Sequence, residues 1–537
     1  MTTVTGNRSA RAVGGVTLAD AAAALRLVAR LPRFLRHPLT PELARAVLER
    51  RLRARETDLL ACLDATGHTS PSGPYRALLR AAGCEPGDVA RLVREHGVEG
   101  ALERLAGAGV YLTADELKGR RPVVRGSVSF TVDPRALRNP RGRPDVPSRS
   151  SGSRGDGTTL GIDLAFVRDC AADSCAALAA QKGERWVKAV WSVPGGMALF
   201  RVLEYAAFGI PTARWFSQLD PATPELHPRY RWSGRVLRWG SRLAGVPLPA
   251  PRLATVDNPR PVLAWLTGVV RGGGTPYLHT FASSAVRLAQ TALDAGRDLA
   301  GVHLTVGGEP LTRARLEAIR RSGATVLPRY GSVECGHLGL GCLAPAAPDD
   351  LHVATDLHAV IQAGVAGVPG LPPRALLVTS LRPTAPLILV NTSLGDEAVL
   401  GARPCGCPLE GLGWASHLYG VRSFEKLTAA GMTFSDGDVV RVLEVVLPGR
   451  FGGGPTDYQL VEQEDGDGGP AVTLIVHPSV GPVEDAALRE TFLTALGAGP
   501  SARVMALAWR EAGLPRVEHR APLPARSGKV LHLLSRR

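Results

Sequence analysis

Residues 150–158 combine the side chains and the backbone freedom that phosphate binding requires. The segment reads Ser-Ser-Gly-Ser-Arg-Gly-Asp-Gly-Thr. Glycines let the backbone approach an anion, hydroxyls donate to phosphate oxygens, and an arginine supplies charge-assisted hydrogen bonds. The segment does not match the Walker pattern ending in Lys-Ser or Lys-Thr, and its composition also suits a flexible linker. The residues that would contact phosphate are Ser150, Ser151, Gly152, Ser153, Arg154, Gly155 and Thr158.

A second segment, Gly307-Gly308-Glu309 followed by Pro-Leu-Thr, lies between strand-like residues 302–306 and an amphipathic stretch over 311–322. A strand, a tight turn and a helix start at the carboxyl edge of a sheet form the usual nucleotide site of an open α/β fold. The alternative is a simple turn in which Thr312 caps the following helix.

A third segment, Tyr330-Gly331-Ser-Val-Glu334, follows the predicted strand 324–327. An adenine ring could stack on Tyr330, and the glycine permits close approach. The carboxylate of Glu334 could hold a magnesium ion that bridges phosphate oxygens. The segment therefore offers groups for both ends of a nucleotide.

Two further polar side chains stand near the ends of apolar segments. Asp396 comes after the apolar run 387–390, which places a carboxylate just past a predicted strand, where it could accept hydrogen bonds from ribose hydroxyls. Lys529 follows Ser527-Gly528 in a proline-flanked loop close to the C-terminus. The alternative for this lysine is a solvated surface charge.

The spacing of apolar residues predicts the elements that position these groups. Residues 17–120 keep helical spacing between proline and glycine breaks. From 185 to 420, β-rich runs alternate with helical stretches, which favours an α/β domain with crossover connections. The rest is expected to form a compact α+β unit with strands over 439–447, 458–462 and 472–477 and a helix over 483–496.

The expected fold is therefore of the α/β class, with three parts. Residues 1–130 form a helical N-terminal lobe, and residues 131–420 form a core of mixed β-sheets flanked by helices. Residues 421–537 form a small mobile α+β domain that carries Lys529.

Composition excludes several other classes of protein. The 63 basic and 49 acidic residues give a formal charge of +14, but the arginines are scattered without interleaved aromatic residues, so we expect no nucleic-acid partner. No uninterrupted apolar stretch could span a bilayer, and no signal peptide is evident, so we expect no membrane association and a cytoplasmic location. Eight cysteines in 537 residues are too sparse for a disulfide scaffold.

Taken together and in this order, the five segments resemble the adenylate-forming superfamily of acyl-CoA synthetases, luciferases and adenylation domains of peptide synthetases. The phenylacetate-CoA ligase branch is most similar. Its first loop is Ser-Ser-Gly-Thr-Thr-Gly with a threonine near its end, as Thr158 stands here, and it shares Gly-Gly-Glu-Pro-Leu-Thr letter for letter. The resemblance covers roughly residues 70–537.

The resemblance implies ATP-dependent activation of a small carboxylic acid to an acyl-AMP, followed by transfer to coenzyme A. Open alternatives are an amine, another small nucleophile or a carrier-protein thiol as acceptor, and a homologue that binds without turnover. The implied roles are phosphate binding by residues 150–155, adenine contact by residues 307–309 and Tyr330, magnesium binding by Glu334, ribose binding by Asp396, a hinge at Arg422, and bridging of the carboxylate and α-phosphate by Lys529. The family also commonly forms homodimers.

Three departures from the family pattern bear on turnover. Val333 replaces the usual hydroxyl residue before the acidic one, and residues 391–394 lack a charged or aromatic residue before the ribose aspartate. After Arg422, Phe424 and Glu425 replace the usual aspartate pair. The first two of these changes motivate the non-catalytic alternative.

The same resemblance gives the cysteines a role. Members of the branch often carry a cysteine after the Tyr-Gly motif, a Leu-His pair, and a Cys-x-Cys pair after the ribose aspartate. Cys342, His352, Cys405 and Cys407 stand in those places. Three thiolates and an imidazole make a closed tetrahedral zinc site. The alternative is a set of separate, reduced thiols.

The acid itself is constrained only by composition. Residues 186–208, 215–219 and 277–284 mix aromatic and small side chains, which suits an aromatic or medium-sized acid.

Overall fold

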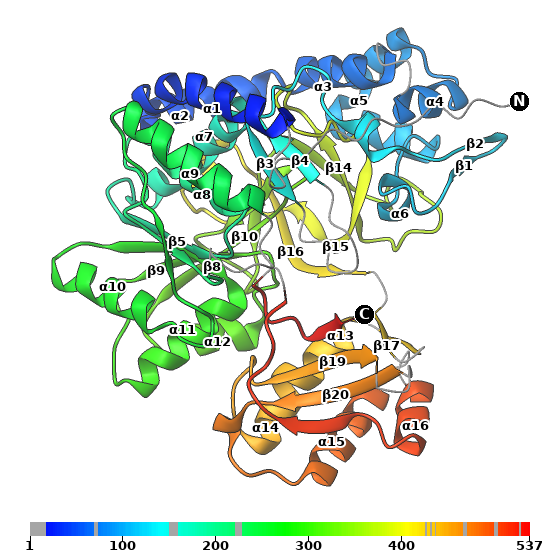
Figure 1. Ribbon diagram of the computed structural model, residues 1–537. Coiled ribbons are helices and arrows are strands. Elements are labelled where there is room, and N and C mark those ends of the chain that lie inside the picture. The colour runs from blue at the N-terminus through cyan, green and yellow to red at the C-terminus, as the bar shows by residue number, and fades with distance from the viewer. Residues whose placement is uncertain are drawn as a thin grey trace, which may run out of the picture.

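The computed structural model describes residues 18–68, 73–149, 159–220, 228–424, 427–429, 432–434, 436–464, 470–498, 503–525 and 528–536 (Figure 1). A large region with one dominant sheet lies above a small C-terminal domain, and the terminal segment (red) rises from the small domain toward the large one. The loop 150–158, predicted to bind phosphate, lies outside the described residues, as does Ser527.

The large region is organised around a twelve-stranded sheet whose two halves differ in direction. Six strands pair in parallel: β7 (Pro251–Leu253), β6 (Arg214–Ser217), β5 (Val187–Ser192), β8 (Pro276–Phe281), β9 (His303–Gly307) and β10 (Thr325–Ser332). The other six continue from β10 in antiparallel pairs: β11 (Gly336–Gly341), β12 (Leu351–Val353), β16 (Ser416–Ser423), β15 (Thr392–Ala402), β14 (Ala375–Ser380) and β13 (His358–Gln362).

Helices cover both faces of the parallel half, as crossover connections require. One face packs against α7 (Leu164–Ala180), α8 (Gly196–Ala206) and α9 (Pro228–Leu243), and the other against α10 (Arg260–Arg271), α11 (Ala282–Asp294) and α12 (Arg313–Arg320). This arrangement confirms the expected α/β class. It also places the ends of β5, β6, β8, β9 and β10 along one edge.

The N-terminal segment is helical, as expected, and shares its apolar cores with the sheet. Its helices are α1 (Leu18–Arg36), α2 (Pro41–Arg53), α3 (Arg55–Leu63), the π-helix η1 (Asp64–His68), α4 (Pro74–Ala81), α5 (Pro86–Gly107) and α6 (Ala114–Leu117). The first two pack with α7 to α9, and the others pack against the antiparallel half. Short elements complete the region: β1 (Val123–Arg125), β2 (Val128–Phe130), η2 (Pro134–Leu137), β3 (Val146–Arg149), β4 (Thr159–Ile162) and η3 (Glu410–Leu412).

The C-terminal domain has its own core. Strand β16 runs past residue 420, where we expected this domain to begin, and ends at Ser423. The domain comprises β17 (Leu427–Ala429), β18 (Met432–Phe434), α13 (Asp436–Arg441), the π-helix η4 (Val442–Val446), α14 (Leu447–Phe451), β19 (Tyr458–Glu464), β20 (Pro470–Val476), η5 (Pro478–Val480), α15 (Asp485–Gly497), α16 (Arg503–Glu511), β21 (Arg516–His519) and β22 (Leu533–Arg536). Its four-stranded sheet has the order β21-β20-β19-β22.

Two local predictions were wrong. Residues 439–447 are helical rather than a strand, because Val439, Val442, Leu443 and Leu447 share one buried helical face despite the valine-rich composition of the segment. The apolar run 387–390 is buried without forming a strand, so Asp396 lies inside β15 rather than just past a strand. An irregular segment that is buried on all sides has the same run of apolar residues as a buried strand, so the sequence does not distinguish the two.

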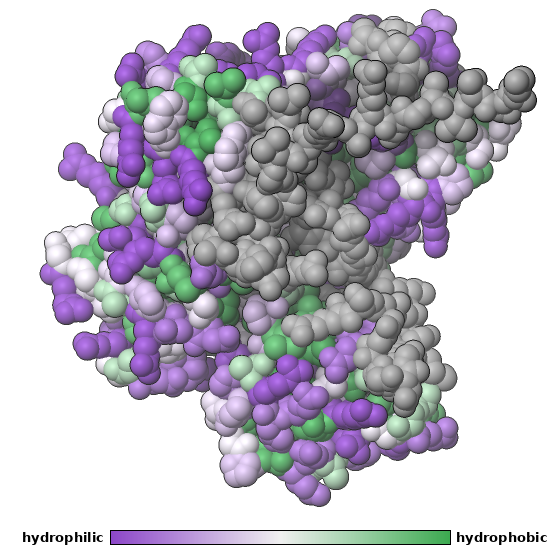
Figure 2. Space-filling view, in the orientation of Figure 1, coloured by the Kyte–Doolittle hydropathy of each residue, from purple (hydrophilic) through white to green (hydrophobic). Residues whose placement is uncertain are grey.

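One face of the molecule is shown by residue hydropathy in Figure 2. Hydrophilic side chains are spread over the coloured face in Figure 2. Among the described residues, none of the helices combines the length and apolarity needed to cross a bilayer.

Candidate active site

Lys529 reaches from the C-terminal domain to the carboxyl edge of the parallel strands. It lies against the turn after β9: a Cβ added to Gly308 would stand 3.0 Å from Cε and 3.2 Å from Nζ of Lys529. Nζ also lies 5.6 Å from the ring centroid of Phe281, at the end of β8. Gly308 has a φ of +76°, a conformation that favours glycine, and the absence of a side chain there leaves room for the end of Lys529.

The residues on either side of Lys529, Gly528 and Val530, contact the large region and hold the loop in place. A Cβ on Gly528 would lie 2.3 Å from Oε1 of Gln218, which follows β6, so only glycine fits there. The backbone N–H of Val530 donates to Oγ of Ser283 at 3.3 Å. Burial lowers the pKa of Lys529, while the charges of Glu309 and Asp396 oppose that shift. The amine is therefore held at the strand edge, where its side chain is partly buried.

Tyr330 and Asp396 meet although their strands are not neighbours in the sheet. The hydroxyl of Tyr330, on β10, donates to Oδ2 of Asp396, on β15, at 2.8 Å. Burial and the adjacent carboxylate raise the pKa of Tyr330 well above its usual value, so the hydroxyl stays protonated. The structure thus brings together the two residues expected to contact adenine and ribose.

The side chain of Glu309 is engaged inside the turn. Its carboxylate accepts hydrogen bonds from the backbone N–H of Ser283 at 2.7 Å and from the Ser283 hydroxyl at 3.0 Å. Arg315 forms an ion pair with the same carboxylate at 3.2 Å, and both side chains are buried. Glu309 therefore fixes the shape of the turn, and Gly308 is the residue of the turn that lies against Lys529.

Two other expected site residues stand further out. Glu334 lies in the turn between β10 and β11 and is partly exposed, directly after the strand end that carries Tyr330 and Gly331. Arg422 lies near the end of β16, and its Nε is 3.5 Å from Oε1 of Glu397, with about half of its side chain exposed. Arg422 is thus one of the last described residues before the C-terminal domain.

Some aromatic residues expected in the acid pocket belong to the core instead. Trp186 stacks on His303 with ring centroids 3.9 Å apart, at the amino end of β9 and so away from Lys529. Trp191 is fully buried, and its indole N–H donates to the carbonyl of Ala254. Each of the three segments named for the pocket contributes residues beside the loop around Lys529, namely Val193, Gln218, Phe281 and Ser283.

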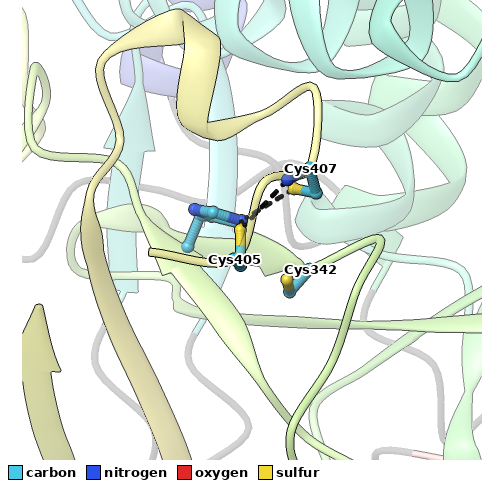
Figure 3. Close-up of side chains that lie close together, drawn as sticks. Cys342, Cys405 and Cys407 are labelled. Atoms are coloured by element: carbon cyan, nitrogen blue, oxygen red, sulfur yellow. Dashed lines mark hydrogen bonds between the residues drawn. The ribbon is translucent and has the colours of Figure 1, made fainter. Parts of the chain in front are cut away.

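The four expected zinc ligands converge (Figure 3). The sulfur atoms of Cys342, Cys405 and Cys407 and a ring nitrogen of His352 all lie within 4.8 Å of one another. Nε2 of His352 is 3.1 Å from Sγ of Cys407 and 3.6 Å from Sγ of Cys405. Ligands of a tetrahedral zinc ion stand about 3.6 Å apart, given the usual zinc–nitrogen and zinc–sulfur distances. The spacing of these atoms therefore fits that ion.

Surrounding contacts orient the cluster. Nδ1 of His352 is 2.6 Å from the carbonyl oxygen of Trp414, which can only accept, so Nδ1 carries the proton and Nε2 faces the thiols. The carboxylate of Glu410 accepts from the backbone N–H groups of Cys405 and Gly406 at 3.0 and 2.7 Å. Such contacts are those that support the ligands of a metal ion.

Protonation affects the candidate metal ligands in different ways. Burial lowers the pKa of His352, which keeps its imidazole neutral. Burial raises the pKa of the Cys342 thiol to about 12. Burial opposes ionisation of Cys407 too, but hydrogen bonds from nearby backbone N–H groups lower its pKa overall. A divalent cation would replace the protons that remain on these thiols.

Sequence analysis missed the side chains that join the two domains. Arg315, Glu444 and His532 meet in a buried cluster although they are far apart in the chain. None of them belongs to a recognisable motif, and no spacing in the sequence links them.

Comparison with known proteins identifies the fold. Neither a protein-family model nor a curated protein matches the chain. Among solved structures, it is similar to 2-hydroxyisobutyryl-CoA ligase in the postadenylation state with 2-HIB-AMP, with 16% identity, a TM-score of 0.53, and coverage of 90% of this chain and 89% of that one.

Two other solved structures match with lower scores. ATP-bound MatB from Rhodopseudomonas palustris has 13% identity, a TM-score of 0.42, and coverage of 75% of this chain and 68% of that one. The anthranilate CoA ligase AuaEII with anthranoyl-AMP has 13% identity, a TM-score of 0.39, and coverage of 73% and 66%. From the similarity to 2-hydroxyisobutyryl-CoA ligase, together with the strand order and the small C-terminal domain, the chain has the fold of the adenylate-forming acyl-CoA ligases.

Proposed function

We propose that the protein uses ATP to activate a carboxylic acid as an acyl-AMP and then transfers the acyl group to coenzyme A or another nucleophile. The observation that carries this proposal is the seating of Lys529 at the Gly308 turn. The Tyr330–Asp396 pair belongs to the same sheet, on β10 and β15. A mobile cation beside a candidate nucleoside site suits the attack of a carboxylate on a phosphate.

In the proposed reaction, a carboxylate oxygen attacks the α-phosphorus of ATP, and the bond from that phosphorus to the bridging oxygen breaks. Pyrophosphate leaves with the electron pair. The ammonium group of Lys529 holds the carboxylate and the α-phosphate together and offsets the negative charge that both bring. Glu334 would hold a magnesium ion, which neutralises charge on the phosphates. Tyr330 and Asp396 would bind the adenosine.

The second step requires access to the adenylate. The small domain would rotate about the segment after Arg422, withdrawing Lys529 and opening the site to an acceptor. Coenzyme A is the acceptor we favour, because 2-hydroxyisobutyryl-CoA ligase shares this fold over most of both chains. An amine or a carrier-protein thiol remains the alternative.

Acid-dependent exchange of labelled pyrophosphate into ATP tests the proposal. The panel should contain aromatic, medium-chain and small 2-hydroxy acids, the last because of the fold relative. We expect exchange with at least one of these classes and none without acid. ATP binding without exchange for every acid would favour the non-catalytic alternative, which Val333 motivates.

Glu334→Gln is expected to reduce magnesium-dependent exchange at least about tenfold, because an amide oxygen lacks the charge that a hard cation prefers. The measurement is the exchange rate as a function of magnesium concentration. Glu317→Gln, at an exposed position on α12, is the control and should behave as wild type. An unchanged magnesium dependence in Glu334→Gln would remove Glu334 as the ligand.

The cysteine cluster is proposed to hold a structural zinc ion. Four protein ligands, Cys342, His352, Cys405 and Cys407, leave no open position for water, so the ion would stabilise rather than catalyse. The site would tie the segment after β11 to the segment between β15 and β16. These strands belong to the same sheet as Tyr330 and Asp396.

A further inference from the structure

Three side chains form a buried polar cluster across the boundary between the large region and the C-terminal domain. Arg315 comes from α12, which follows the Gly308 turn. Glu444 comes from the π-helix η4 of the C-terminal domain, and His532 precedes β22. We call these three residues the interdomain cluster.

The contacts within the interdomain cluster are close and convergent. Nε of Arg315 lies 2.7 Å from Oε1 of Glu444. Nε2 of His532 lies 2.6 Å from the same carboxylate oxygen and 3.1 Å from Nη2 of Arg315. The hydroxyl of Thr312, the N-terminal cap of α12, donates to the other oxygen of Glu444. One carboxylate of the small domain thus binds two groups at the start of α12.

Because Arg315 and Glu444 are buried, removing only one of them is expected to be energetically unfavourable. The side chains of Arg315 and Glu444 are each 1% exposed. Burial opposes ionisation of Glu444, but Arg315, together with His532 and Thr312, lowers its pKa to about 2, so the carboxylate is charged. Removing one partner of a buried ion pair leaves an uncompensated charge in a medium of low dielectric constant. The pair therefore favours the domain orientation in which both partners meet.

The interdomain cluster is connected to the site of Lys529. Arg315 also pairs with Glu309, whose carboxylate accepts both hydrogen bonds from Ser283. The Ser283 hydroxyl in turn accepts from the N–H of Val530, next to Lys529. An unbroken series of polar contacts therefore runs from Glu444 to the loop around Lys529.

We propose that the interdomain cluster positions Lys529 for acyl-AMP formation, an inference that rests on the function proposed above. Arg315, Glu444 and His532 are positioning residues, since they act through the orientation of the small domain. A second interdomain ion pair supports the same orientation, because Arg287 on α11 lies 3.0 Å from Asp457.

The test measures pyrophosphate exchange and amide hydrogen exchange of residues 528–534 in wild type and Glu444→Gln. We expect the rate of pyrophosphate exchange to fall about tenfold or more, because the competent orientation is populated less. Amides of residues 528–534 should exchange faster, since Val530 loses its fixed partner. Glu116→Gln removes a buried ion pair with Arg125 inside the large region and should change neither quantity.

A second pair of variants tests the proposal independently in case Glu444→Gln fails to fold. His532→Leu should reproduce both effects, whereas His532→Gln, whose amide nitrogen can occupy the place of Nε2, should restore most of the wild-type behaviour. Unchanged hydrogen exchange of residues 528–534 in both Glu444→Gln and His532→Leu would overturn the proposal. If wild type exchanges no pyrophosphate with any acid, the proposed function fails, while hydrogen exchange still decides whether the interdomain cluster holds the terminal segment.

Discussion

Lys529→Ala is expected to lower the rate of acyl-AMP formation by about 100- to 1,000-fold, the usual effect of removing one preorganised group that stabilises a transition state. The affinity for ATP should change little, because the cation acts mainly on the charge that develops between the carboxylate and the α-phosphate. Pyrophosphate exchange measures the first quantity, and calorimetric titration with ATP measures the second.

The structure supplies controls for this prediction. Lys529→Arg keeps the charge, but its planar guanidinium must fit where Cε and Nζ already lie close to Gly308, so activity should remain low. Lys118→Ala, at the end of α6 in the large region, should leave exchange unchanged. Wild-type exchange in Lys529→Ala would refute the assigned role.

The lowered pKa of Lys529 also predicts how the rate of pyrophosphate exchange depends on pH. Burial lowers its pKa below the ordinary value of 10.5, so its ammonium form is lost at a lower pH than that of a free lysine. The exchange rate should therefore fall as the pH rises through a value below 10.5. That alkaline limb should be missing from the residual activity of Lys529→Ala.

Cys405→Ser is expected to remove the bound metal and lower thermal stability together. Wild-type protein that has not been exposed to a chelator should contain about one zinc ion per chain, because a closed site with four protein ligands binds one ion. Loss of the ion should lower the midpoint of thermal unfolding by about 2–5 °C, because a few kcal/mol corresponds to such a shift when the unfolding entropy is about 2.1 cal/mol/K per residue in a chain of this size. Exchange activity should fall only as the neighbouring segments loosen.

Elemental analysis and thermal unfolding decide this prediction. Cys84→Ser, at a half-buried thiol outside the cluster, is the matched control and should keep both zinc content and stability. Zinc below roughly a tenth of an equivalent in wild type, as adventitious binding would give, would leave the cluster as reduced thiols and a neutral histidine.

Local patterns in the sequence were sufficient for many elements of the fold. The strand that ends at Gly307, the helix after Thr312, and the elements β19, β20 and α15 of the C-terminal domain each follow from periodicity and capping within one segment. The same approach was wrong for residues 439–447, because valine-rich composition outweighed the helical spacing of Val439, Val442, Leu443 and Leu447. Composition alone does not show which face of an element will be buried.

The sequence by itself determined which chemical groups are available and in what order, including Lys529 in a glycine loop and a Cys-x-Cys pair. Tertiary structure alone decided which of them meet. Tyr330 reaches Asp396 across non-neighbouring strands, and Glu309 turns inward to Ser283. Arg315 joins Glu444 and His532 from another domain. A sequence motif reflects the backbone conformation that a short segment must adopt. Contacts between distant residues depend instead on how sheets and domains pack, and the spacing of residues within one segment does not determine that packing.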